Sequence, residues 1–124
     1  MLVTVLAVSV IDDRPIVECR SPTGLLGGVW RADFRPVPGQ SYIVEVNVPG
    51  TVAWGKELAV DVATSTGQRN ALVGQIEAIE GDTLTVRVDE SVVLLDVEGD
   101  GPAAQIGLTV LLRPGALEFY PTGI

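Results

Sequence analysis

Turn-forming residues divide this chain of 124 amino acids into many short segments, which limits what it can fold into. Fourteen glycines and eight prolines are scattered between short apolar runs, and these two residue types punctuate secondary structure. Much of the apolar content is valine, leucine and isoleucine, and the β-branched members pack well on a pleated surface. The pattern therefore predicts many short β-strands joined by turns, with little room for helix.

The apolar runs recur at the spacing expected of a β-sandwich or a small barrel. The cleanest alternation is at 41–48, where Tyr42, Val44 and Val46 alternate with residues that include Glu45 and Asn47. Several runs are apolar on both faces, which favours strands curved around a closed core. We expect roughly eight to ten short strands, with candidate segments at 2–11, 15–20, 29–34, 41–48, 52–54, 57–63, 71–79, 83–89, 91–97, 108–113 and 117–120, and one short helical turn at 102–105.

The expected fold is all-β, a single small closed or partly open barrel that is OB-like. The length suits one domain, 1–124, that can bury a core of its own. A polar loop at 64–68 is the best boundary between two halves, 1–63 and 69–124.

Cysteine content and the first residues indicate the compartment. Cys19 is the single cysteine, so no intramolecular disulfide can form, which fits a reducing compartment. The apolar run at 2–11 has no Lys or Arg before it and is followed by Asp12 and Asp13, unlike a signal peptide. No apolar run reaches the roughly 18 residues that suggest a membrane span. We expect a cytoplasmic protein.

The chain contains no histidine, and this removes much of the enzymatic repertoire. Ser-His-Asp and Cys-His arrangements and His-based zinc sites are excluded. Cys19 lies in a strand-like run and is best read as a core or edge thiol. The acidic loop at 96–101 begins like a calcium loop, but its twelfth position is Gly107 where a glutamate is needed. We therefore expect no enzyme, no cofactor and no metal.

Acidic residues concentrate between positions 71 and 100, where eight carboxylates and one arginine give −7 of the net charge of −8. Such a surface attracts basic proteins and repels phosphate backbones, which argues against nucleic-acid binding. The sequence predicts a non-catalytic module for a basic protein partner, of which an inhibitor or immunity-type protein is one form. The expected partner-binding residues are four acids and two aromatic anchors: Asp89, Glu90, Asp96, Glu98, Trp54 and Tyr42.

Residues 69–124 resemble the small OB-like barrel modules of the TOBE and molybdopterin-binding-protein (Mop) type. The resemblance is carried by Arg69-Asn70 before an apolar strand with Gly74, by the run 81–88, and by 106–112 leading into 117–119. Modules of that type bind small oxyanions or sense ligands, often across a dimer interface. The resemblance implies an alternative function, a small-ligand or oxyanion-binding domain.

In that alternative, polar side chains around the loop between the halves hold the anion, and they are Ser65, Thr66, Arg69 and Asn70. A lysine near the last strands is common in such anion sites, whereas this chain has Arg113 there. The sequence leaves open whether the chain is a monomer or a homodimer.

Overall fold

The computed structural model is built of β-strands, as the sequence predicts. It describes residues 1–60, 69–99, 101 and 104–122, and within these ranges there are eleven strands and no helix. A helix that could cross a membrane is therefore not found in the described part of the chain. The strands are β1 (Leu2–Ile11), β2 (Arg14–Ser21), β3 (Gly24–Trp30), β4 (Ser41–Asn47), β5 (Thr51–Ala53), β6 (Leu58–Val60), β7 (Leu72–Glu80), β8 (Thr83–Val88), β9 (Ser91–Glu98), β10 (Thr109–Leu112) and β11 (Glu118–Pro121).

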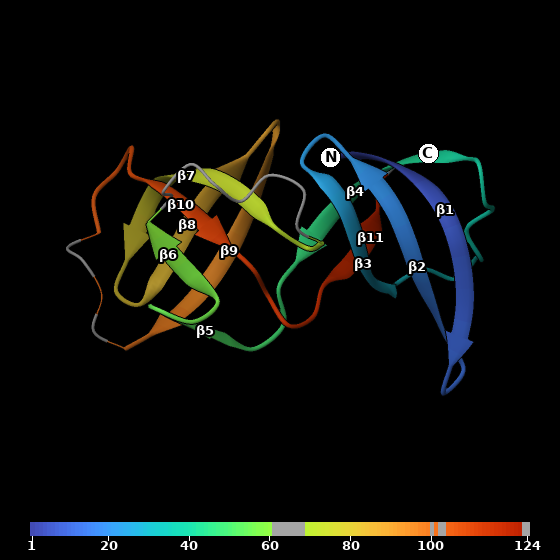
Figure 1. Cartoon of the computed structure of the whole chain (residues 1–124), viewed down its shortest axis with the longest axis horizontal. Coiled ribbons are helices and arrows are strands. Elements are labelled where there is room, and N and C mark those ends of the chain that lie inside the picture. Colours follow the sequence, from blue (N-terminus) through green and yellow to red (C-terminus); the bar gives the residue numbers. More distant parts are fainter. Residues whose placement is uncertain (61–68, 100, 102–103, 123–124) are drawn as a thin grey trace.

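The strands form two sheets that lie side by side along the long axis of the molecule (Figure 1). The first is a closed barrel in the order β1-β2-β3-β11-β4. The second has six strands in the order β5-β9-β8-β7-β10-β6. Because β5 and β6 are consecutive in the chain yet lie at its two edges, this sheet curls until it is nearly closed. An all-β barrel fold is thus confirmed, and the second sheet adds to the one barrel that was expected.

The last strand closes the first barrel. β11 lies between β3 and β4, parallel to β3 and antiparallel to β4, so the chain from β5 to β10 is inserted between two barrel strands. The proposed boundary between the halves 1–63 and 69–124 falls outside the described residues, and those halves stay a prediction. The sheets themselves comprise 2–47 with 118–121, and 51–112.

Burial follows the predicted alternation. In β4, Val44 and Val46 are buried while Ile43, Glu45 and Asn47 face outward. Buried residues of both sheets belong to one continuous hydrophobic cluster. Since burying one such aliphatic side chain contributes about 1.5–3 kcal/mol, the two sheets stabilise each other through this shared core.

The predicted strand at 29–34 is wrong in its position, because the strand runs from Gly24 to Trp30 instead. Gly27 and Gly28 lie within this strand. A Cβ atom on Gly28 would press on the backbone carbonyl oxygen of Leu117 and lie 2.9 Å from Cε2 of Phe119. This residue therefore lacks a side chain so that β11 can approach β3.

Replacing Gly28 with alanine should weaken barrel closure. The new methyl group meets backbone, which cannot rotate away, so we expect the free energy of unfolding to fall by about 1–3 kcal/mol. Urea unfolding monitored by tryptophan fluorescence measures this change. Gly115→Ala is the matched control: its Cβ meets nothing within 4 Å, and we expect a change within about 0.5 kcal/mol. Equal stability of the two variants would contradict the role given to Gly28.

Candidate functional site

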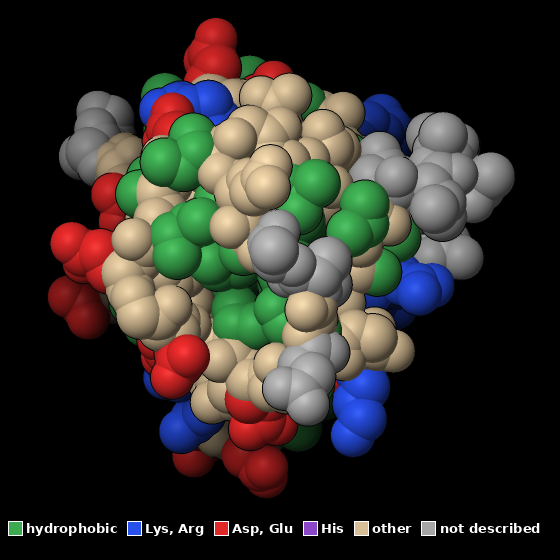
Figure 2. Space-filling view, turned by 90° about the vertical axis from the view of Figure 1, so that its left-hand side faces the viewer, with side chains coloured by type: hydrophobic (Ala, Val, Ile, Leu, Met, Phe, Trp, Pro, Cys, Tyr) green, Lys and Arg blue, Asp and Glu red, His purple; other side chains and the backbone are tan. Residues whose placement is uncertain are grey.

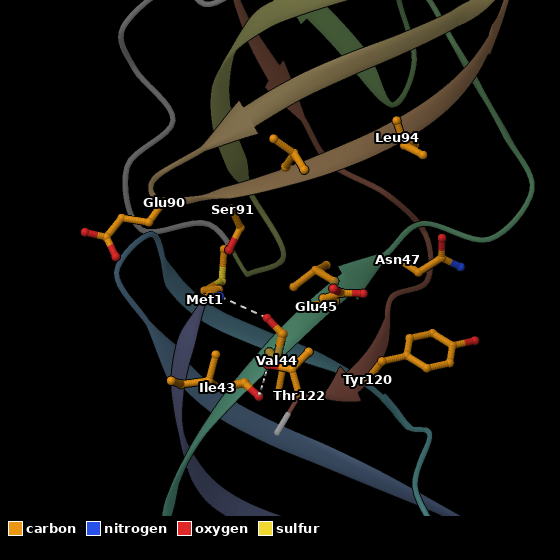
Figure 3. A pocket seen from close by; sticks show the side chains of 12 residues that line it. Met1, Ile43, Val44, Glu45, Asn47, Glu90, Ser91, Leu94, Tyr120 and Thr122 are labelled. Atoms are coloured by element: carbon orange, nitrogen blue, oxygen red, sulfur yellow. Dashed lines mark hydrogen bonds between the residues drawn. The ribbon is translucent and has the colours of Figure 1, made fainter. Parts of the chain in front are cut away.

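A groove of about 700 Å³ lies between the barrel and the second sheet. One wall is the outer face of β4 with the end of β11, and the other is the start of β9 (Figure 3). Large concave sites are the usual places for binding partners or ligands. The lining residues are Met1, Ile43, Val44, Glu45, Val46, Asn47, Glu90, Ser91, Val92, Leu94, Tyr120 and Thr122.

Large apolar side chains lie exposed on both walls of the groove. Ile43 is 59% exposed, Leu94 61%, Val92 47% and Tyr120 41%. They are exposed because β4 and β9 each turn alternate residues outward, and on both strands these outward positions include apolar residues. Apolar side chains gathered in one concave place mark interaction sites more often than scattered ones do. None of these four residues was predicted from the sequence as part of a site. The one signal that the sequence offers for them is an apolar residue at a strand position where the alternation places side chains outward.

The charged side chains of the groove are carboxylates. Glu45 and Glu90 line it, and no lysine or arginine does. Within the described ranges, neither carboxylate has an ion pair. The amino group of Met1 also lies there and donates a hydrogen bond to the Val44 carbonyl at 2.9 Å (Figure 3). The groove is therefore apolar with an acidic rim.

A buried carboxylate fixes one end of the groove. Glu118 on β11 is 9% exposed; its Oε2 accepts from Arg31 Nη2 at 2.6 Å, and its Oε1 accepts from Asn47 Nδ2 at 2.7 Å. The hydrogen bond from Asn47, followed by that from Arg31, holds the pKa of Glu118 below its ordinary value. Because these partners come from β4 and from the residue after β3, the network ties three barrel segments together.

The four acidic residues predicted to bind a partner are not gathered in one place. Asp89 and Glu90 form the turn between β8 and β9, whereas Asp96 and Glu98 lie at the far end of β9. Asp96 lies six positions after Glu90 along extended chain, which is about 20 Å at about 3.3 Å per residue. Only Glu90 of this set lines the groove.

Trp54 lies at that far end of the second sheet. It is half-buried rather than exposed, packs against the core, and its backbone N–H donates to the Glu98 carbonyl at 3.2 Å. Gly101 lies against its ring, because a Cβ there would overlap the indole. Figure 2 shows hydrophobic side chains around a hollow at this end of the molecule, with carboxylates nearby. The hollow beside Trp54 measures only about 100 Å³.

Tyr42 is half-buried, packs against the core, and does not line the groove. Its ring packs edge-on against Trp30, with 5.1 Å between ring centroids, and also contacts Phe34. Its hydroxyl oxygen accepts a hydrogen bond from the Val37 N–H at 3.0 Å. These contacts give Tyr42 a packing role, and they do not test its predicted role as an anchor.

The residues of the alternative anion site make contacts that join the two sheets. Asn70, with a φ of +60°, accepts a hydrogen bond from the Gly27 N–H at 2.7 Å, and Arg69 pairs with Glu18 at 2.9 Å. Ser65 and Thr66 lie outside the described residues. The contacts of Arg69 and Asn70 are structural, and the anion site stays a prediction.

Reactive groups are not assembled in the described part of the chain. Cys19 is fully buried, as expected of a core thiol, and burial raises the pKa of its thiol to about 12, with a smaller contribution from Glu18. A thiol with such a pKa is a poor nucleophile at neutral pH. Among the described residues, no three acidic or cysteine side chains are grouped so as to hold a metal ion.

Comparisons of this chain with protein-family models, curated proteins and solved structures found no match.

The stability of the fold should depend on the ionisation of Glu118. Its pKa is lower in the folded than in the unfolded chain, so its contribution is complete above the unfolded value and is lost as the pH falls through the folded one. Glu118→Gln should lower the free energy of unfolding at pH 7 by about 1–3 kcal/mol and reduce the further loss between pH 5 and about pH 3. Urea unfolding across this range measures both.

Glu77→Gln is the control for that variant. Glu77 pairs with Arg87 at 2.6 Å, but both side chains are more than 40% exposed, and exposed pairs contribute little. An acid-dependent loss in Glu118→Gln as steep as in the unaltered protein would show that this carboxylate is not responsible.

Proposed function

We propose that this chain is a non-catalytic module that binds a basic protein partner. The observation that carries the proposal is the groove, where exposed Ile43, Leu94 and Tyr120 stand beside the carboxylates of Glu45 and Glu90 and no basic side chain. Apolar contact gives affinity in such a site, and the carboxylates select the sign of the partner's charge. The net charge of −8 adds long-range attraction for a basic protein.

The barrel is proposed to be OB-like. Without the inserted segment 51–112, its strands follow the order 1-2-3-5-4, and the third and fifth are parallel. This order and the number of five strands support an OB-like architecture. OB barrels bind a variety of ligands, so the fold alone does not select one. The charge of the groove selects against phosphate backbones and small oxyanions.

Binding without catalysis suits the described side chains. The chain has no histidine, its cysteine is buried, and its carboxylates are distributed over both sheets. A nucleophile, a base and an oxyanion donor are the parts that a catalytic proposal requires. The single buried thiol also fits a reducing compartment, and we place the protein in the cytoplasm.

Charge reversal in the groove should abolish capture of the partner. In native mass spectrometry of the tagged protein recovered from its own host, we expect a stoichiometric complex with a basic protein. The double variant Glu45→Lys with Glu90→Lys should lose this complex, because it places two positive charges against a basic surface. Both side chains are exposed, so the variant should keep its fold, which circular dichroism checks.

The double variant Asp96→Lys with Glu98→Lys is the matched control. It changes the net charge equally but lies at the other end of β9, outside the groove. It should keep the complex and only slow its formation at low salt. A bare chain from the host, a bound small molecule alone, or equal loss in both double variants would overturn the proposal.

A further inference from the structure

One edge of β9 is unpaired where β9 forms a wall of the groove. β8 pairs with β9 along 91–96, but on its other side β9 pairs, among the strands that the structure describes, only with β5, at 96–98. In an antiparallel pair, alternate residues direct their N–H and C=O groups to the same neighbour. The Val97 N–H bonds to the Asp82 carbonyl at 2.8 Å, so the odd-numbered residues of β9 face β8. The backbone groups of Val92 and Leu94 therefore point to the open side.

β4 on the opposite wall also has an open stretch. Val44 exchanges two hydrogen bonds with Met1, of 2.8 and 2.9 Å, and the pairing of β4 with β1 covers only 41–43. By the same alternation, the N–H and C=O of Val46 face the side of β1, beyond the last residue that pairs there. No described strand pairs with β4 on that side after Val44.

Among the described residues, the edge of β9 from 91 to 95 carries none of the usual protection. Proteins protect exposed edges with lysine, proline, bulges or a covering element, because a free edge pairs with other chains. Between 91 and 95, β9 has no lysine, no proline and no shift of register with β8, whereas the pairings of β1 with β2 and of β7 with β8 both contain a shift. Its outward residues there, Val92 and Leu94, are apolar and about half exposed.

We propose that the groove accepts an extended, basic segment of the partner, which adds as a strand to the free edge of β9. The backbone of the segment would bond to Val92 and Leu94, as in other cases of strand addition. Apolar residues of the segment would contact Ile43 and Leu94, and its lysine or arginine residues would reach Glu45 and Glu90. This inference rests on the proposed function and specifies how the partner is held.

Charge and shape favour this occupant over others. A second copy of the chain would bring another −8 of net charge to an acidic groove. A compact small molecule would leave the backbone groups of the edge unsatisfied, whereas an extended peptide supplies matching donors and acceptors. The groove is long enough to involve residues of β9 from Ser91 to Leu94 and of β4 from Ile43 to Asn47.

A short synthetic peptide tests the proposal directly. The probe is an acetylated, amidated heptapeptide of alternating lysine and valine, with three companions: two with N-methyl groups on either the lysines or the valines, and one with glutamate in place of lysine. In calorimetric titration we expect the first peptide to bind, one N-methylated form to bind at least about tenfold more weakly, and the acidic form not to bind.

Amide exchange locates the contact. In the free protein, the amides of Val92 and Leu94 should exchange faster than those of Val93 and Leu95, which face β8. Saturation with the lysine–valine peptide should slow exchange at Val92 and Leu94 alone. Fast exchange there in the presence of bound peptide would show that the peptide binds by its side chains only, and would overturn strand addition.

Leu94→Lys is the variant, and Leu25→Lys is its control. Both leucines are exposed on strands, at 61% and 46%, and both variants gain one positive charge, but Leu25 lies outside the groove. Only Leu94→Lys should weaken peptide binding and the host complex, by at least about tenfold. A host complex that survives in Leu94→Lys while the peptides fail to bind would reject the strand mode and leave the proposed function standing. Without any host complex, the proposed function itself would be rejected.

Discussion

Closure of the first barrel by β11 is the contact on which the rest of the structure depends. Glu118 on β11 lies 87 residues after Arg31, whose side chain it binds. The whole second sheet is therefore formed by the chain between β4 and β11, which are neighbours in the barrel. Gly28 lets the Leu117 carbonyl approach, and the Val29 N–H bonds to that carbonyl at 2.9 Å. Glu118 then joins the barrel segments on either side. Contacts so distant in sequence are costly in chain entropy, which a shared core has to offset.

The groove is a consequence of this insertion. Because the chain leaves the barrel at the end of β4 and re-enters it at β11, these neighbouring strands form the side that faces the second sheet. β9 packs against β4 there without pairing with it, so both strands keep backbone groups open to the space between them. A second contact joins the sheets: Asn70, just before β7, accepts a hydrogen bond from the Gly27 N–H of β3 and so attaches the second sheet to the barrel.

Much of the secondary structure could be predicted from the sequence, because strand periodicity is local. The alternation at 41–48 and the turns at prolines and glycines identified most strands to within one or two residues. The error at 29–34 has a physical reason: a glycine pair signals a turn unless a close backbone approach requires it, and that approach involves Leu117, far along the chain. Sheet order is likewise non-local, so neither the return of β11 nor the second sheet could be derived from local patterns.

The candidate site was harder to predict for the same reason. Acidic residues close in sequence were expected to form one surface, but the extended residues 91–95 of β9 separate Asp89 and Glu90 from Asp96 and Glu98. Glu45, more than forty residues earlier in the chain, is the carboxylate that shares the groove with Glu90. Charge that is distributed in this way provides attraction from several directions, whereas selectivity depends on the few carboxylates beside apolar contacts. An edge strand left open between such carboxylates favours a partner that is both extended and basic over one that is only basic.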